Sequence, residues 1–299
     1  MFLAEQAHML LFYGITPMHA GSGSSTGAVD LPIQRERHTQ RPIVQSSGVK
    51  GALRDTCEQI SPNAAELVAI FGSEGQDSTQ AGALSTTDAK IFFFPVRSSH
   101  APFLYVTCPS VLRQFVRDSK AIGLAGTEAL TQIQVHPQEY LPLNETIRTS
   151  GNTTGGIVLE DMRLTVSDSD QGTGFLQEIL SRIVNFEDVE LLANAVIIAD
   201  SDFQYLVETT CPVQSRIRID GQTGVVATGG LFYEELLPAD TLLYSVCFLS
   251  AERKAKNGLS ATELNTWLHK TLPQHIQLGG DATLGRGYCE LQWVSKEDK

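Results

Sequence analysis

Basic residues are scarce in this sequence. Its 299 residues include 22 lysines and arginines against 34 aspartates and glutamates, which gives a formal net charge of -12 at pH 7. A surface with this excess of negative charge repels nucleic acids and anionic membranes at long range. Any contact with RNA or DNA must therefore come from a local cluster of basic residues.

Cysteine is also scarce, and its spacing forms no metal-binding or disulfide pattern. The five cysteines lie at positions 57, 108, 211, 247 and 289, without a C-x-x-C pair. An odd total with these spacings indicates neither a zinc site nor a disulfide framework. We expect five buried, reduced thiols, which are typical of a cytoplasmic protein.

Long apolar runs are missing too. No stretch approaches the roughly 18 apolar residues of a transmembrane helix, and the first residues, MFLAEQAHMLLFYG, lack the basic start of a signal peptide. We therefore expect neither secretion nor a membrane span. Hydrophobic residues nevertheless make up 42% of the chain, which is enough for the core of one large or two ordinary domains.

The patterns of strands and helices alternate along the chain and predict an α+β protein. Strands are expected at 8–16, 89–95, 103–107, 195–199 and 241–249, and helices at 48–60, 62–70, 175–184, 261–272 and from Pro109 onward. The pair Asp220-Gly221 is a typical turn between the segment VQSRIRID and the strand-like residues after DGQTG. We expect a hairpin there.

The middle of the chain differs in composition. Residues 144–174 are polar, with paired glycines and the run SDSDQGTG. This composition predicts a protruding β-rich insertion or a mobile loop rather than a part of the core. We therefore divide the chain into a body formed by 1–143 and 175–299 and an insertion formed by 144–174.

Residues 17–45 are interpreted as one long ordered loop. Gly21, Gly23 and Gly27 spell G-x-G-x-x-x-G after a strand, which superficially resembles a dinucleotide-binding loop. Such a loop must open a helix, but Pro32 and a basic run follow, and no Lys-Ser or Lys-Thr pair completes a Walker motif. A small-molecule enzyme that uses this loop is the less favoured interpretation.

The basic run is the more informative feature. Residues 31–54 contain five bases and one acid, a local charge of +4 in an acidic chain: Arg35, Arg37, Arg41, Lys50 and Arg54 against Glu36. Lys50 and Arg54 are four residues apart at the start of an expected helix, whose first turn we expect Ser46 and Ser47 to cap. Backbone amides of that turn point the same way, which favours an anion contact. A merely solvated helix face is the alternative.

Two further residues of the long loop carry chemistry. Asp30 lies between the glycines and the basic run, where it serves as a turn residue, holds a divalent cation, or accepts a proton from a ribose hydroxyl. His19 lies eleven residues earlier, and a structural histidine is its simplest interpretation. No nucleophile elbow accompanies the pair, so a Ser-His-Asp hydrolase is not supported.

Two sites in the second half are weaker signals. Glu234 and Glu235 follow an aromatic pair, and a solvated strand end is their simplest interpretation. The run GGDATLGRG, residues 279–287, contains four glycines and Arg286. Such a loop either brings backbone close to a phosphate or makes a tight hairpin.

Several long motifs together resemble a known family. They are TPMHAGSGSSTGAVDLPIQRERHTQRP, SSGVKGALR, FPVRS, VTCP, RIRID, LFYEELLP and QLGGDATLGRG, and they cover nearly the whole chain in order. The chain is similar to the RAMP superfamily, and specifically to the backbone subunits of the type III-B CRISPR effector, the Cmr complex. One departure is visible, because Gln45-Ser46-Ser47-Gly48 stands where the family usually has Pro-Gly-Ser-Ser.

The resemblance implies a hand-shaped subunit with an RRM-like or ferredoxin-like palm, helical fingers and a β-rich thumb. It implies that Asp30 is the RNA-cleaving residue and a possible ligand of Mg²⁺ or another divalent cation, with His19 and Glu234 as accessory residues. It assigns guide-RNA contacts to the helix start and to the glycine-rich loop: Ser47, Lys50, Arg54, Gly279, Gly280 and Arg286. Arg35 and Arg37 of the basic run are added as RNA-binding candidates because of their charge.

The resemblance thus predicts a cytoplasmic endoribonuclease that works within a multisubunit particle. Its partners would be a guide CRISPR RNA, a target RNA, copies of itself in a helical filament and other subunits of the effector, with no membrane. Base pairing would supply the sequence specificity. A filament subunit that binds guide RNA without cutting the target, with Asp30 as a turn residue, is the alternative.

Overall fold

The structure is a computed structural model, and it describes residues 5–73, 80–149, 156–167, 173–186, 189–253 and 258–295. Its strands, in chain order, are β1 (Gln6–Gly14), β2 (Ile43–Val44), β3 (Leu84–Thr86), β4 (Ala89–Arg97), β5 (Phe103–Thr107), β6 (Glu139–Pro142), β7 (Gly156–Leu159), β8 (Met162–Val166), β9 (Ala195–Ile198), β10 (Val213–Ile219), β11 (Val226–Glu235), β12 (Leu242–Leu249), β13 (His275–Gln277) and β14 (Tyr288–Val294).

The helices are α1 (Ser46–Ile60), α2 (Ala65–Phe71), α3 (Pro109–Ala121), α4 (Glu145–Thr149), α5 (Thr173–Ser181), α6 (Asp200–Thr209) and α7 (Ala261–Thr271). Short 3₁₀ turns lie at Glu128–Gln132, Leu192–Asn194 and Ala282–Leu284. No helix of the described ranges is both long and apolar enough to cross a membrane. The expected mixture of helices and strands is confirmed.

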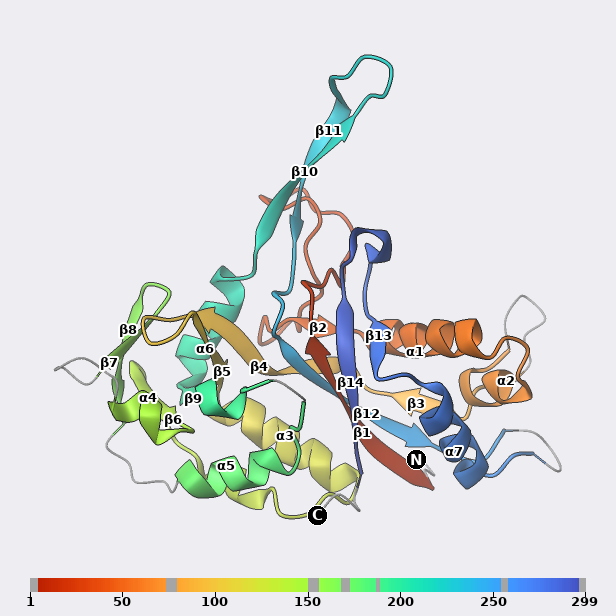
Figure 1. Cartoon of the computed structure of the whole chain (residues 1–299), viewed down its shortest axis with the longest axis horizontal. Helices are drawn as coiled ribbons and strands as arrows, with labels where there is room; N and C mark the ends of the chain where they lie inside the picture. Colours follow the sequence, from red (N-terminus) through yellow and green to blue (C-terminus); the bar gives the residue numbers. More distant parts are fainter. Residues whose placement is uncertain are drawn as a thin grey trace.

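The centre of the fold is a ferredoxin-like palm. Four strands lie in the order β14-β1-β12-β4, and each neighbouring pair is antiparallel. Helix α1 falls between the first and second of these strands in the chain, and α7 falls between the third and fourth. This is the β-α-β-β-α-β pattern of ferredoxin-like folds, in which two split β-α-β units interleave. Figure 1 shows these strands crossing the middle of the molecule, with α1 and α7 to their right.

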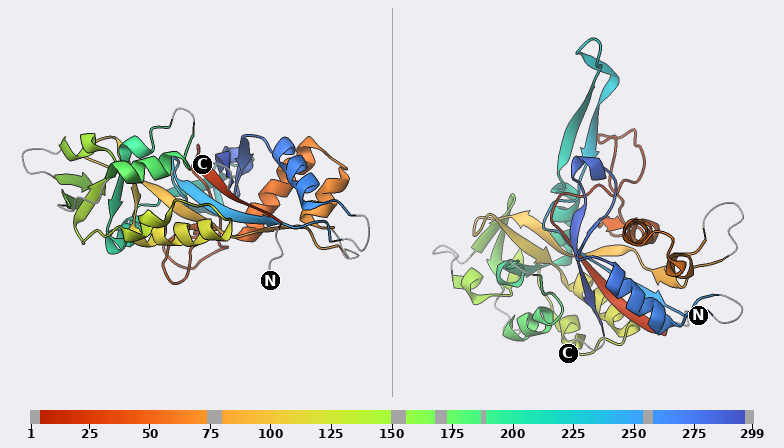
Figure 2. Two further views of the ribbon diagram at one scale, coloured as in Figure 1. Left: turned by 90° about the horizontal axis from the view of Figure 1, so that it is seen from below. Right: turned by 45° about the vertical axis from the view of Figure 1, so that its right-hand side comes forward.

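The sheet continues beyond the palm into a second lobe. From β4 it runs through β5, β9, β6, β8 and β7, which completes a 12-stranded sheet with β2 and β3 attached to its path. Helix α3 packs on this region, where the Phe92 and Phe115 rings stack 4.2 Å apart. The left view of Figure 2 shows the body of the molecule as an elongated layer with helices at both ends.

One hairpin projects from this body. Strands β10 and β11 form a separate two-stranded sheet, which confirms the hairpin expected around Asp220-Gly221. We call this hairpin, residues 213–235, the arm. Figures 1 and 2 show it extending well away from the palm. Its side chains are largely exposed, including apolar ones such as Ile217, Ile219 and Leu231.

The projecting element is therefore not the one expected at 144–174. Residues 156–166 form the hairpin β7–β8, but this hairpin ends the large sheet, and Ile157, Leu159 and Leu164 are buried. Their alternation in GIVLEDMRLTV is the signature of a half-buried strand, which the polar residues around it obscured. Residues 150–155 and 168–172 lie outside the described ranges. The division of the chain at 144 and 174 remains a prediction.

The five cysteines confirm the expected thiols. All are free and buried. Burial raises the pKa of each thiol, for example to about 12 at Cys57 and Cys289. A thiol whose thiolate is disfavoured in this way is a poor nucleophile and acts as a small apolar side chain.

Candidate functional site

The long loop between β1 and α1 is ordered because it adds to the base of the arm. Leu31 forms a parallel bridge with Glu234, donating its amide to the carbonyl of Tyr233, and its own carbonyl accepts the amide of Glu235. Met18 and Leu237, just after β11, form an antiparallel bridge. Backbone hydrogen bonds to β11 thus give the loop an extended conformation that its sequence does not encode. The interpretation of residues 17–45 as an ordered loop is confirmed.

Asp30 is held directly at this junction. Its Oδ2 accepts a hydrogen bond from the Tyr233 amide at 2.8 Å, 203 residues away in the chain. The carboxylate is partly exposed, and Oδ2 is the oxygen that β11 orients. A partly exposed carboxylate in a fixed orientation can accept a proton or contribute to a cation site.

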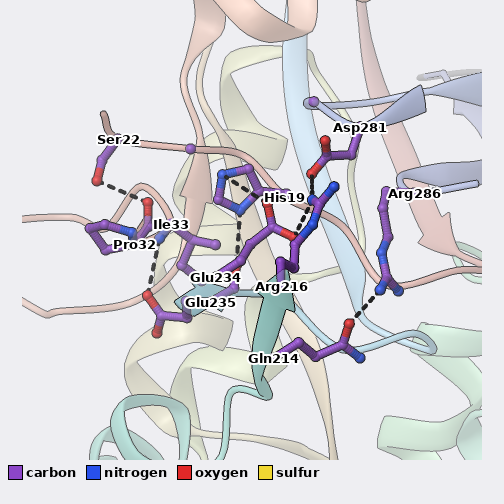
Figure 3. Close-up of polar contacts among 12 residues, drawn as sticks. His19, Ser22, Pro32, Ile33, Gln214, Arg216, Glu234, Glu235, Asp281 and Arg286 are labelled. Carbon is purple, nitrogen blue, oxygen red and sulfur yellow. Dashed lines mark hydrogen bonds and ion pairs between the residues drawn. The ribbon is translucent and has the colours of Figure 1, made fainter. Parts of the chain in front are cut away.

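His19 contacts the next residues of the same strand. Its Nδ1 lies 2.8 Å from the carbonyl oxygen of Glu235, so this nitrogen donates a proton to it. Its Nε2 lies 3.9 Å from Oε1 of Glu234. The structure therefore gathers Asp30, His19 and Glu234 around residues 233–235, as Figure 3 shows for the last two.

Glu234 is buried, with 2% of its side chain exposed, and its main partner is an arginine of the opposite strand. Nη1 of Arg216, on β10, lies 2.9 Å from Oε2 of Glu234 and 2.9 Å from Oδ2 of Asp281. The two carboxylates raise the pKa of Arg216, with its hydrogen bond to Glu234 as the largest cause. The expectation of a solvated strand end at Glu234 is wrong, because β10 and the glycine-rich loop cover it.

The glycine-rich loop, residues 279–287, lies close to His19. The Gly280 amide donates to the His19 carbonyl at 2.7 Å. Gly279 has φ +86°, and a Cβ there would lie 2.5 Å from the same oxygen, so a side chain is excluded. Arg286 donates from Nη2 to Oε1 of Gln214 at 2.5 Å, a second link between this loop and the arm (Figure 3).

The arginines of the basic run differ in their surroundings. Arg35 donates to Oε1 of Glu235 at 2.6 Å and to the carbonyls of Gln40 and Val207, so its guanidinium braces the loop against the arm and α6. The side chain of Arg37 is exposed on the same loop. Among these bases, Arg37 is the more accessible to an anion and Arg35 is the more structural.

Helix α1 confirms the expected helix, with two differences. The N-cap is Gln45, without a side-chain cap, and Ser46 and Ser47 lie in the first turn. The carboxylate of Asp88 accepts the Ser46 amide, so Asp88 rather than a serine satisfies that donor. Ile60 was expected on the apolar face but is 51% exposed, because the helix ends there.

Lys50 and Arg54 leave α1 on one side, as expected from their spacing. Lys50 donates to the carbonyl of Leu84 at 2.8 Å, and Arg54 donates to that of Gly72 at 3.0 Å. Burial lowers the pKa of Lys50, and the charges of Arg253 and Arg54 lower it further. Lys50 lies about one turn after the exposed Ser47 of the first turn, and Arg54 lies about one turn further along α1.

No group of three or more potential metal ligands occurs within the described residues. Mg²⁺ does not require such a group, because it is commonly held by one or two carboxylates together with phosphate oxygens of the substrate. Asp30 fits that role as a single carboxylate on a partly exposed loop.

The class of protein follows from this combination of a ferredoxin-like palm, a projecting β arm and a basic helix start. The model of the RAMP superfamily matches residues 11–290. The chain therefore belongs to the RAMP superfamily.

The particular relatives define its place within that family. The chain is 34% identical over 296 residues to the CRISPR system Cmr endoribonuclease Cmr4 of Pyrococcus furiosus, with 96% of this chain and 95% of the relative covered. The crystal structure of oligomeric Cmr4 from the same organism is 26% identical, with a TM-score of 0.74 and coverage of 97% of this chain and 98% of that one. The resemblance seen in the sequence is confirmed.

The same fold occurs in a larger particle. A chain in the cryo-EM structure of the type III-B Cmr-beta complex bound to cognate target RNA is 21% identical, with a TM-score of 0.76. The alignment covers 97% of this chain and 98% of that chain.

Sequence reasoning overlooked Arg216 and Asp281. Both lie within motifs that carried the family resemblance, RIRID and QLGGDATLGRG, but neither was considered as a site residue. An arginine in a strand and an aspartate in a loop are common in any protein. Only the contact of Arg216 with both Glu234 and Asp281 identifies the two as site residues.

Proposed function

We propose that this chain is an RNA-guided endoribonuclease subunit. It contacts the sugar-phosphate backbone of the guide RNA and cuts the complementary target RNA, with Asp30 as the catalytic residue. The main structural support for this proposal is the hydrogen bond between Asp30 and the Tyr233 amide. It holds a partly exposed carboxylate at the base of the arm. The 34% identity to an endoribonuclease over nearly the whole chain supports the activity.

The chemistry requires few protein groups. RNA carries its own nucleophile, the 2′-hydroxyl, so the protein must remove its proton, align it with the phosphorus and offset the developing charge. Asp30 would accept this proton or help to hold a divalent cation. His19, on the same loop as Asp30, and Glu234, on β11, would position groups or supply a proton to the leaving oxygen. The expected products are a 2′,3′-cyclic phosphate and a 5′-hydroxyl.

A divalent cation is the proposed cofactor, with Asp30 and phosphate oxygens of the RNA as its ligands. When bound, such an ion stabilises negative charge at the reacting phosphate. Besides Asp30, the site has the carboxylates of Glu234 and Glu235, which contact Arg216 and Arg35, and that of Asp281, which also contacts Arg216. EDTA should then stop cleavage by the assembled particle.

The guide would lie against the start of α1, with Ser47, Lys50 and Arg54, and against the glycine-rich loop with Gly279, Gly280 and Arg286. Contacts to phosphates carry no sequence information, so recognition would rest on base pairing. Arg35 and Arg37 would extend the positive surface. We also propose a cytoplasmic location and assembly with other effector subunits.

Copies of the chain would stack along the guide. A contact between different faces of identical subunits generates an open helical filament, which suits a linear RNA. The oligomeric crystal form of the Pyrococcus relative supports this arrangement.

Replacing Asp30 with asparagine tests the proposal, because the amide keeps the size of the side chain and removes its charge. The assembled particle should still bind guide and target RNA but should no longer cut. The matched control is Asp161→Asn, an exposed aspartate on the second lobe, which should cut normally. Near-normal cutting by Asp30→Asn would favour the non-catalytic alternative or another site, and 3′-hydroxyl products would indicate attack by water.

A further inference from the structure

Arg216 joins two acidic side chains from different parts of the fold. Its Nη1 contacts Glu234, on the neighbouring strand of the arm, and Asp281, in the glycine-rich loop, at 2.9 Å each. Glu234 is 2% exposed, whereas Arg216 is 28% and Asp281 25% exposed. A buried carboxylate needs a positive partner. Arg216 is the positive partner of Glu234, and it is shared with a second acid, Asp281.

The two oxygens of Glu234 face different partners, Arg216 and His19. Oε2 of Glu234 takes the guanidinium, and Oε1 is the oxygen that lies 3.9 Å from Nε2 of His19. The other ring nitrogen of His19 is fixed by the carbonyl of Glu235. Both ends of the imidazole therefore face consecutive residues of β11, and the orientation of Glu234 decides what Nε2 meets.

The surroundings of Asp281 favour the ionised form of its side chain. It adopts φ +57°, a left-handed conformation that aspartate tolerates better than most side chains. Burial by itself raises the pKa of Asp281, but hydrogen bonding with Glu234 and the charge of Arg216 outweigh it and lower the pKa. The loop thus presents an ionised carboxylate to the guanidinium.

The result is a chain of alternating contacts, Asp281 to Arg216 to Glu234 to His19, which Figure 3 shows running from the glycine-rich loop across the arm. The positive charge of the Arg216 guanidinium is shared between two carboxylates. Each carboxylate is therefore neutralised less than it would be by an arginine of its own. Oε2 of Glu234 meets the guanidinium, and Oε1 is the oxygen on the side that faces His19. Removing Arg216 or Asp281 changes the contacts of Glu234, and Asp281 and His19 also interact directly through their charges.

We propose that Arg216 and Asp281 are positioning residues of the cleavage site, which set the orientation and charge of Glu234 and through it the state of His19. This inference rests on the proposed function, because it assigns them to RNA cleavage. A tether between the arm and the loop is the competing role for the same contacts.

Single-turnover cleavage by the assembled particle, with target RNA already bound, tests the inference. Asp281→Asn should lower the rate about 10-fold, the scale expected for a small misplacement near a reacting group, with target affinity unchanged. In a Glu234→Gln background the same substitution should change the rate less than about 2-fold, since residues that act through one another are not additive. Equal effects in both backgrounds would overturn the inference.

Gln214→Ala is the matched control for a tether. It removes the other link between the arm and the glycine-rich loop, the hydrogen bond from Arg286, without touching Glu234. Its rate should stay near that of the unchanged protein. If Gln214→Ala slows cleavage as much as Asp281→Asn, the contacts act as tethers and the inference is wrong.

A measurement without RNA separates this inference from the proposed function. The ring ¹⁵N resonances of His19, assigned with His19→Asn, should shift in Asp281→Asn and in Arg216→Lys. Unchanged resonances would overturn the link whether or not the particle cuts RNA. If the protein without substitutions does not cut RNA, but the variants still shift the His19 resonances, the proposed function is refuted. The positioning link between Asp281, Arg216, Glu234 and His19 then remains valid.

Discussion

Replacing Lys50 and Arg54 together with alanine tests whether guide RNA lies along the start of α1. Both side chains are held in place by carbonyl oxygens, of Leu84 and Gly72, so their positive charges have defined positions before any RNA binds. Burial and two neighbouring arginines, Arg253 and Arg54, lower the pKa of Lys50. A phosphate placed among these charges would relieve their repulsion, which makes the start of the helix favourable for an anion.

The size of the effect follows from counterion release. Each phosphate contact contributes about 0.7 to the slope of log affinity against log salt concentration for a single strand, so the loss of two contacts lowers the slope by about 1.4. Over a fourfold rise in salt, from about 50 to about 200 mM, the unchanged protein should lose about 7-fold more affinity than the double variant. This difference should not depend on the guide sequence, because phosphates carry none.

Fluorescence anisotropy with labelled guide RNA at several salt concentrations measures the slope. The variant Lys50→Arg with Arg54→Lys keeps both charges and should keep the slope, and Arg182→Ala, an exposed base paired with Glu178 on the other lobe, should leave it unchanged. Thermal melts of all variants separate loss of binding from loss of folding, since each alanine also removes a hydrogen bond. An unchanged slope in a folded double alanine variant would refute the assignment of Lys50 and Arg54.

Three further predictions concern the stability and reactivity of the fold. Gly287→Ala should destabilise the protein by about 2 kcal/mol in urea denaturation, because a Cβ there would lie 1.8 Å from the Leu278 carbonyl oxygen; Gly285→Ala, at a similar φ but in open space, should cost less. The five cysteines should resist a thiol reagent at pH 8 in the native protein and react after unfolding, because burial raises their pKa values to about 11 or 12; rapid native labelling would contradict this. The lowered pKa of Asp281 contributes stability that is present above the ordinary value of 3.8 and is lost as the pH falls below it. Asp281→Asn should therefore lose less stability than the unchanged protein between pH 5 and pH 3, and parallel losses would count against this.

The local elements could be predicted where one physical preference dominated. The apolar spacing of Val49, Leu53 and Cys57 marked α1, and these three residues are buried. The pair Asp220-Gly221 marked the turn of the arm. Each of these features depends on residues close together in the chain, so the sequence contained all the necessary information.

The position of the projecting element could not be predicted in this way. Polarity around 144–174 suggested an arm, whereas the described part of that segment completes the large sheet, and the arm is β10–β11. Whether a hairpin lies on the sheet or projects from it depends on which strands have a partner, and that is a property of the whole fold.

By itself the sequence determined the α+β class, the principal helices and strands, and the motifs that carry the family resemblance, because these depend on local preferences and on ordered runs of residues. Only the tertiary structure decided which side chains meet. Asp30 meets Tyr233 across 203 residues, His19 meets Glu235 across 216, and Arg216 meets Asp281 across 65. No local pattern encodes such contacts. They arise because β10, β11 and the glycine-rich loop come together at the base of the arm, where buried charge must find a partner.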